Sequence, residues 1–223
     1  MDCIGPSVNL SLHSYGLRNM ETRQNRRRYR MRKRQEALDA MRDRIAQAAF
    51  ELHRDVGPSQ ATISAIAERA GVQRHTVYRH FPDMVQLIRA CTLHGMQVTH
   101  LPDPEPWHGV ADPLARLRRA LGELYPYYRA NEQLIGNILR DLPVMPDLAA
   151  GSAPYQDHLG RIWGAVLEPW ADAPSPAGDR LRALVSAALE LGTWQALARR
   201  GGLSDADAAE TMLRAVQGTL AAE

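Results

Sequence analysis

Residues 62–81 read TISAIAERAGVQRHTVYRHF, and this stretch decides the fold. It places the small Ala67, a glycine four residues later at Gly71, and the β-branched Val77 six residues after that. Two short helices that cross steeply around a tight turn need this spacing. The alanine lets the helix axes approach, the glycine takes the left-handed conformation at the bend, and the valine fills the angle between the helices. The stretch therefore predicts a helix-turn-helix.

The second helix of this pair carries side chains suited to nucleic acid. We expect its polar side chains to point outward. Hydrogen-bond donors and flat rings of these kinds suit phosphates and base edges. The candidates on this helix are Arg74, His75, Thr76, Tyr78, Arg79 and His80. A purely structural three-helix unit is the alternative interpretation, and this outward polar set favours DNA binding over it.

The bulk composition sets the class of protein. With 223 residues, 45% of them hydrophobic, the chain can bury a core, which excludes wholesale disorder. No apolar run approaches the ~20 residues that span a bilayer, and no secretion signal begins the chain, so we expect a cytoplasmic protein with no membrane partner. Two cysteines cannot build a disulfide scaffold, and Cys91 suits a small buried hydrophobe.

Charge is divided sharply along the chain. Residues 1–35 hold nine basic and two acidic residues, a net charge of +7, whereas the other 188 residues hold 18 basic and 23 acidic, a net charge of −5. No helical or strand period marks residues 1–35. Three interpretations stay open: a solvated, disordered tail, an arm that contacts DNA, or a misassigned start, since Met20, Met31 and Met41 are alternatives.

The rest of the chain reads as helices separated by proline- and glycine-rich breaks, with no strand pattern. The pattern predicts an all-α fold of about nine helices: 36–56, 62–70, 74–80, one beginning at 84, 113–128, 131–141, one through 159–170, 179–199 and 204–221. We expect three parts. These are the basic tail at 1–35, a helix-turn-helix DNA-binding domain at 36–83, and a helical effector-binding and dimerisation domain at 84–223.

A family resemblance rests on residues 44–88, RIAQAAFELHRDVGPSQATISAIAERAGVQRHTVYRHFPDMVQLI. This segment resembles the tetracycline-repressor (TetR) family of bacterial transcriptional regulators, most specifically at Thr76-Val77-Tyr78 and His80-Phe81. The resemblance implies a homodimer whose last two helices, here 179–199 and 204–221, form a four-helix bundle with the partner's. It also implies a repressor that binds a palindromic operator in double-stranded DNA and is released by a small-molecule effector, which the sequence does not identify.

The resemblance also assigns DNA-contacting roles at particular positions. Thr62 matches the family's cap beside a phosphate, and Ser64 matches a position that reaches a base edge. Arg74 is the best candidate for a direct contact, because a guanidinium can bond a guanine with two parallel donors. Two departures weaken the match: Gln73 replaces the usual serine cap of the recognition helix, and Met84 replaces a lysine that contacts phosphate.

Aromatic residues on the apolar helices of the body suggest a cavity for a flat or apolar ligand. The candidate ligand-binding residues are Tyr125, Tyr128, Trp163, Glu190 and Trp194. Aromatic residues at helical spacing are more often core, and Glu190 alternatively serves as an exposed carboxylate. A void of several hundred Å3 lined by Trp and Tyr would favour control by a ligand. A packed core would favour a helix-turn-helix dimer that acts through a protein partner or as an activator.

Catalytic and metal-binding motifs are missing from the sequence. It contains no glycine-rich phosphate loop, no HExxH and no GxSxG. Cys91 and His94 lie three residues apart, but zinc needs four convergent ligands. We therefore expect no enzyme, no cofactor and no metal.

Overall fold

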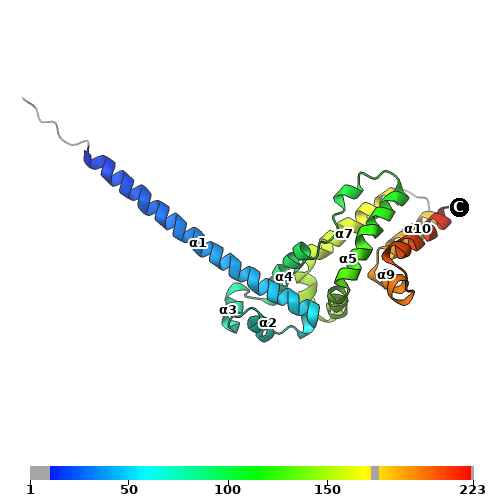
Figure 1. Cartoon of the computed structure of the whole chain (residues 1–223), viewed down its shortest axis with the longest axis horizontal. Coiled ribbons are helices and arrows are strands. Elements are labelled where there is room, and N and C mark those ends of the chain that lie inside the picture. Colours follow the sequence, from blue (N-terminus) through cyan, green and yellow to red (C-terminus); the bar gives the residue numbers. More distant parts are fainter. Residues whose placement is uncertain (1–10, 172–175, 222–223) are drawn as a thin grey trace, which may run out of the picture. The chain divides into compact units, whose positions relative to one another are not determined.

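A computed structural model of the chain describes residues 11–171 and 176–221, with side chains from residue 26 onward. The described residues form α-helices and short helical turns without a strand among them, which confirms the all-α prediction (Figure 1). None of these helices is long and apolar enough to cross a membrane. The helices are α1 Ser11–Asp55, α2 Ile63–Arg69, α3 Arg74–His80, α4 Met84–Val98, α5 Pro113–Asp141, α6 Pro146–Gly151, α7 Ala153–Leu167, α8 Ala177–Ala188, α9 Leu191–Trp194 and α10 Asp205–Ala221.

The chain divides into two compact units, residues 1–44 and 45–223. Helix α1 begins at Ser11, so residues 11–35 are helical where the sequence predicts no period, and residues 1–10 lie outside the described residues. Apolar periodicity misses this part because its described side chains, residues 26–40, are all exposed, and only a helix with a buried face shows a stripe. DNA contact by residues 1–35, and a domain boundary after residue 83, stay predictions.

Helix α5 replaces the two helices predicted at 113–128 and 131–141. Asp112 caps its start by accepting a hydrogen bond from the Ala115 amide at 2.6 Å. Pro126 lies inside the helix and is exposed, so its missing N–H leaves a gap on the solvent side rather than in the core. No glycine or proline lies between Tyr127 and Asn131, where the sequence pattern predicts a break, and the helix runs through to Asp141.

The long helix predicted at 179–199 is instead broken after α8. Two tyrosines of α5 donate hydrogen bonds to the carbonyl groups at that end: Tyr125 to Ala188 at 2.9 Å and Tyr128 to Leu189 at 2.5 Å. Glu190 then takes an extended conformation (φ −78°, ψ 139°) before α9 begins. Because side chains satisfy the last carbonyl groups of α8, the helix can end there without a glycine or proline.

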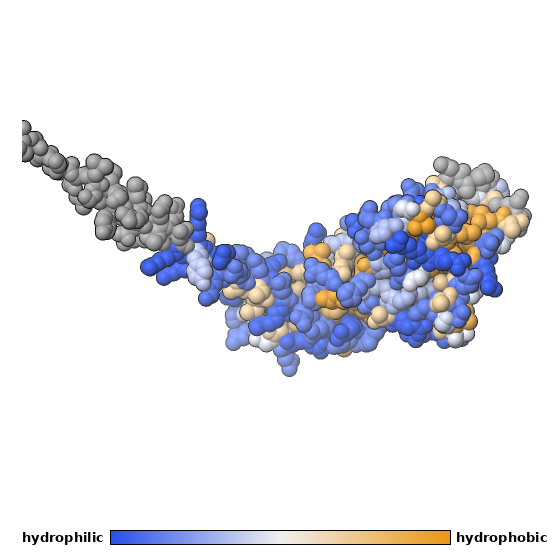
Figure 2. Space-filling view, turned by 45° about the horizontal axis from the view of Figure 1, so that its top comes forward, coloured by the Kyte–Doolittle hydropathy of each residue, from blue (hydrophilic) through white to orange (hydrophobic). Residues whose placement is uncertain are grey.

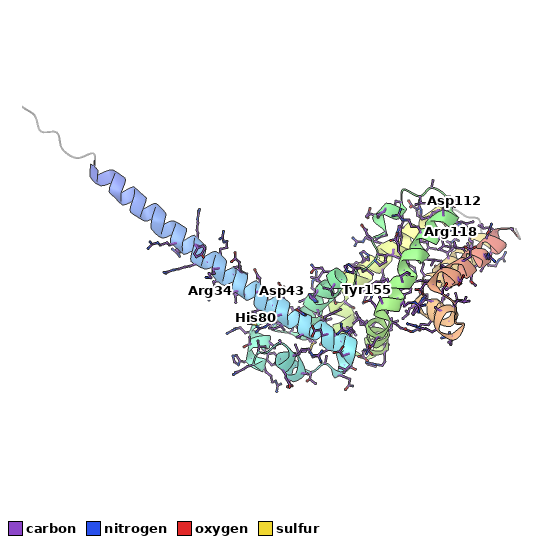
Figure 3. All side chains as sticks on the ribbon, in the orientation of Figure 1. Arg34, Asp43, His80, Asp112, Arg118 and Tyr155 are labelled. Carbon is purple, nitrogen blue, oxygen red and sulfur yellow. The ribbon has the colours of Figure 1, made fainter. Side chains whose placement is uncertain are left out.

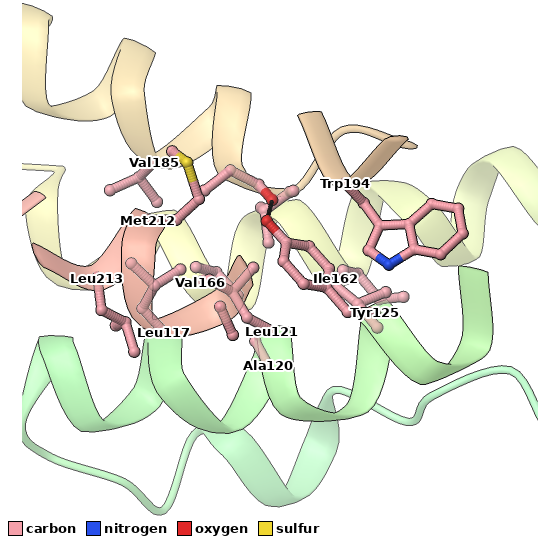
Figure 4. Packing of buried hydrophobic residues seen from close by; sticks show 14 of the residues in the cluster. Leu117, Ala120, Leu121, Tyr125, Ile162, Val166, Val185, Trp194, Met212 and Leu213 are labelled. Carbon is pink, nitrogen blue, oxygen red and sulfur yellow. Dashed lines mark hydrogen bonds between the residues drawn. The ribbon is translucent and has the colours of Figure 1, made fainter. Parts of the chain in front are cut away.

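The main hydrophobic core lies among α5, α7, α8 and α10 (Figure 4). Leu117, Leu121 and Val166 are fully buried within it, as is Trp107 from the loop before α5. Full burial of each aliphatic side chain of this size stabilises the folded state by about 1.5–3 kcal/mol. This core fixes α5 as the central helix of the larger unit.

Helices α4 and α6 pack closely against one another. At Gly151 of α6, an added Cβ atom would lie 2.6 Å from the Cβ atom of Ile88 on α4. The two helices approach this closely only because residue 151 has no side chain. Helix α4, which follows the helix-turn-helix in the chain, is therefore fixed to the body through α6.

Candidate nucleic-acid interface and body cavity

The helix-turn-helix has the geometry that its sequence predicts. Thr62 caps α2 by accepting a hydrogen bond from the Ala65 amide at 3.2 Å. Gly71 takes the left-handed conformation at the bend, with φ +63°. Val77 is fully buried in the angle between α2 and α3. Thr62, Gly71 and Val77 therefore each have the structure that the sequence predicts.

Most of the predicted DNA-contacting side chains are accessible to a ligand. The exposed ones are Thr62, Ser64, Gln73, Arg74, His75, Tyr78 and Arg79, and Thr76 is half-buried. Helix α3 carries two arginines and no acidic residue, so its exposed face attracts a polyanion. Base and phosphate contacts at these positions stay predictions.

His80 corrects one of these assignments. Its side chain is only 6% exposed, so it cannot point outward into a groove (Figure 3). His80 follows the buried Val77 by three residues, and positions three apart share one face of a helix. The sequence contained this signal, and the histidine belongs to the inner face of α3.

The two departures from the family pattern, Gln73 and Met84, lie at the starts of α3 and α4. Gln73 precedes α3 in an extended conformation and makes no side-chain capping bond, as expected for a poorer cap than serine. Asp83 does cap α4, accepting a hydrogen bond from the Gln86 amide at 2.8 Å. Met84, the first residue of α4, is half-buried and offers no charge to a phosphate.

Helix α5 holds the C-terminal end of α1 through amide side chains. Asn137 donates to the Arg54 carbonyl at 2.8 Å, and Gln133 donates to the Asp55 carbonyl at 3.2 Å. The last carbonyl groups of a helix have no partner within that helix. Helix α5 supplies these partners, which fixes the end of α1 to the body.

Asp141, the last residue of α5, holds the turn that follows α1. Its side chain is 3% exposed and accepts a hydrogen bond from the Ser59 amide at 2.9 Å. Arg140 donates to the same carboxylate at 2.8 Å and to the Val56 carbonyl at 3.2 Å. The Arg140 hydrogen bond, with a smaller contribution from Ser59, lowers the pKa of Asp141 to about 2. The charged form is therefore the one that this turn binds.

A cavity of about 130 Å3 lies in the larger unit, bounded by the end of α1 and by α4, α5, α6, α7 and the α8–α9 break. Three of the predicted ligand-binding residues line it: Tyr128, Trp163 and Glu190. These residues come from α5, α7 and the break, so the fold brings them together from distant parts of the sequence. Ligand binding by them stays a prediction.

Tyr125 and Trp194 do not line this cavity. Both are fully buried in the main core, where Tyr125 binds the Ala188 carbonyl and the Trp194 indole N–H donates to Asp205 at 2.8 Å (Figure 4). Arg129 and Arg199 lie over the Trp194 ring, with guanidinium carbons 5.6 and 5.1 Å from its centroid. Tyr125 and Trp194 are therefore core residues, which was the alternative interpretation of these aromatic side chains.

Sequence reasoning missed several polar residues of the cavity. Thr99, Tyr127 of α5 and Tyr155 of α7, which Figure 3 labels, also line the cavity, and burial raises the pKa of both tyrosines. The apolar stripe of α7 does not reveal Tyr155, because a tyrosine there is equally compatible with a filled core. The cavity therefore has hydroxyl groups within a mostly apolar wall.

His53 and Cys91 form a buried pair at the cavity wall, with the sulfur 3.2 Å from Nδ1 of the imidazole. Burial lowers the pKa of His53 to about 4 and raises the pKa of Cys91 to about 12. Both groups are therefore uncharged at neutral pH. Cys91 is 4% exposed, which confirms the prediction of a buried cysteine. Among the described residues, no three His, Cys, Asp or Glu side chains converge as a metal site would require.

Comparisons with known proteins agree with this geometry. Residues 45–91 match the family model described as bacterial regulatory proteins, tetR family. The chain is similar to the crystal structure of NalD, the secondary repressor of the MexAB-OprM multidrug efflux pump in Pseudomonas aeruginosa. The TM-score is 0.58 and the identity 21%, over 82% of this chain and 97% of NalD. A structure of native NalD gives a TM-score of 0.54 and 24% identity, over 82% and 96%. At these low identities, the TM-scores show a shared fold and no more. The search of curated proteins found no match.

Proposed function

Because residues 45–91 of this chain belong to the TetR family of bacterial regulatory proteins, we propose that the protein is a cytoplasmic transcriptional repressor. It binds a palindromic operator through α3 and leaves the DNA when a small molecule enters the body cavity. The observation that carries this proposal is the exposed face of α3, where Arg74, His75, Tyr78 and Arg79 are presented beside a buried Val77. Side chains of these types bind phosphates and base edges in a major groove.

Dimerisation is proposed through α8 and α10. Figure 2 shows apolar surface gathered over the C-terminal helices, and Leu220 of α10 is 40% exposed. Leu184 of α8 is only half-buried, so α8 also offers apolar surface to a partner. A two-fold axis between two copies relates their two α3 helices, and it predicts two inverted half-sites about one helical turn or somewhat more apart.

Control by a ligand is supported by the contents of the cavity. Its wall includes Trp163 and three tyrosines, the residue types that would favour control by a ligand, but its volume of about 130 Å3 is smaller than the several hundred Å3 expected. Helices α4 and α5 both contribute to this wall; α4 follows α3 directly along the chain, and α5 contacts residues 58–60, the turn before α2. A ligand that separates them would therefore shift the position of α3. The alternative, a dimer that answers to a protein partner or activates transcription, needs no change in the cavity.

The test is a selection of bound DNA from a random pool by the full chain at a stated salt concentration. We expect enrichment of one inverted repeat, because two symmetry-related α3 helices read the same half-site. Recovery of unrelated sequences, or of none, would contradict sequence-specific recognition by a dimer. The salt concentration matters because phosphate contacts depend steeply on it.

A further inference from the structure

We propose that the body cavity binds a single-ring aromatic amine in its cationic form, accepts the neutral isostere less well, and rejects the corresponding anion. This rests on the proposed function only in assigning the effector to this cavity. Three features support it: the size of the cavity, the charges in its wall, and the backbone break that brings Glu190 to it.

The size of the cavity limits the ligand to about one ring. Its volume is about 130 Å3, and a dry cavity of about 150 Å3 is known to bind benzene. The wall includes the aromatic side chains of Phe50, Tyr155 and Trp163. A ligand with two or three fused rings would need the surrounding helices to separate.

The wall offers an anion no positive charge. Among the described residues that line the cavity, there is no lysine and no arginine. His53 is the one basic side chain among these lining residues, and burial lowers its pKa to about 4, so it is neutral at pH 7. A carboxylate or phosphate entering this space would lose its hydration without gaining a cationic partner, which is costly.

Glu190 supplies the only acidic side chain among these lining residues. Its carboxylate makes no hydrogen bond or ion pair with any other described residue, and it does not cap α9. Since the side chain is exposed and yet lines the cavity, it lies where the cavity meets solvent. Its charge reaches the interior: after burial, Glu190 is the largest cause of the raised pKa of Tyr128.

The position of Glu190 follows from the break between α8 and α9. A continuous helix over 179–199 would satisfy its carbonyl groups within the helix, but Tyr125 and Tyr128 bind the carbonyl groups of Ala188 and Leu189 instead. The chain then turns at Glu190, which leaves its carboxylate at the edge of an apolar cavity. This arrangement suits a ligand whose ring enters the cavity and whose ammonium group stays at the edge.

The experiment titrates the full chain, without DNA, with three molecules of one size: phenethylamine, 2-phenylethanol and phenylacetate. Calorimetry should give the tightest binding for phenethylamine, about fivefold weaker binding for the alcohol, and weaker binding still for phenylacetate. A partly solvated ion pair is worth about this factor. In the Glu190→Gln protein, the amine and the alcohol should bind within about twofold of each other.

Two further variants make the result specific. Glu105→Gln removes an exposed carboxylate in a loop away from the cavity and should leave all three affinities unchanged. Glu190→Asp retains the charge and should retain the preference for the amine, and thermal unfolding shows that each variant is folded. Equal binding of amine and alcohol to the natural protein, tighter binding of phenylacetate, or no binding of any of the three would overturn the proposal. None of these results bears on DNA recognition, which the selection experiment tests separately.

Discussion

Asp141 is predicted to hold the helix-turn-helix to the body, and Asp141→Asn tests this directly. The substitution keeps the size of the side chain but removes the charge that the Ser59 amide and Arg140 bind. Hydrogen bonds to a buried charged group contribute about 1.5–3 kcal/mol, and the Arg140 ion pair adds little because that guanidinium is half exposed. We therefore expect a loss of about 2 kcal/mol in the free energy of unfolding, or about 4–8 °C in Tm.

The dependence on pH distinguishes this mechanism from a general loss of packing. The pKa of Asp141 is lowered from 3.8 to about 2 in the folded protein. Its charge therefore stabilises the fold fully above about pH 4, and this contribution is lost as the pH falls toward 2. Urea unfolding at pH 7, 4 and 3 should show a constant difference between the natural protein and the variant at pH 7 and 4, and a smaller one at pH 3.

The matched control is Asp147→Asn, which alters an exposed aspartate at the start of α6. It should change the free energy of unfolding by less than about 0.5 kcal/mol. An equal loss in both variants, or a difference for Asp141→Asn that stays the same at pH 3, would refute the role given to this carboxylate.

Three further perturbations test other features of the chain. Deleting residues 1–35 should make the salt dependence of operator binding less steep. The slope of log affinity against log salt concentration should fall by about 0.9 for each phosphate that these residues neutralise. An unchanged slope would favour a tail that does not touch DNA. Met84→Lys should tighten operator binding and steepen the same slope by about one unit, and no change in slope would contradict a missing phosphate contact there. Arg116→Met removes a buried guanidinium that binds three backbone carbonyl groups, so urea unfolding should show a loss of about 3 kcal/mol. Arg118→Met, an exposed arginine on the same helix, is its control, and a similar loss there would show that burial is not the cause.

The helix-turn-helix could be predicted from the sequence because its determinants are local. Ala67, Gly71 and Val77 act within a segment of twenty residues, and each of them meets the backbone or side-chain requirement that its type implies. The same periodicity, applied from Val77, would have placed His80 inside. Its assignment to the DNA-contacting set came from residue chemistry alone, and burial overrides it.

The body could be predicted only as a set of helices. The end of α8 depends on tyrosines about sixty positions earlier in the chain, and no local signal marks it. The cavity depends on five helices and a break meeting at one place, so sequence spacing could not separate Trp163, which lines it, from Trp194, which does not. Charge patterning marks residues 1–35 as strongly basic, but periodicity could not detect the helix from Ser11 onward, because its described side chains over residues 26–40 bury no face.

The exposed face of α3 is proposed to read base edges, and Arg74→Ala tests this role most directly. Binding of the natural protein and the variant should be measured by fluorescence anisotropy on the selected operator and on a scrambled duplex of equal length and salt. A bidentate contact to guanine predicts a loss of about 1–3 kcal/mol on the operator and little change on the scrambled duplex. Arg89→Ala, an exposed arginine of α4 outside the predicted set, should leave this discrimination intact. An equal loss on both duplexes, or no loss on the operator, would contradict sequence reading by α3.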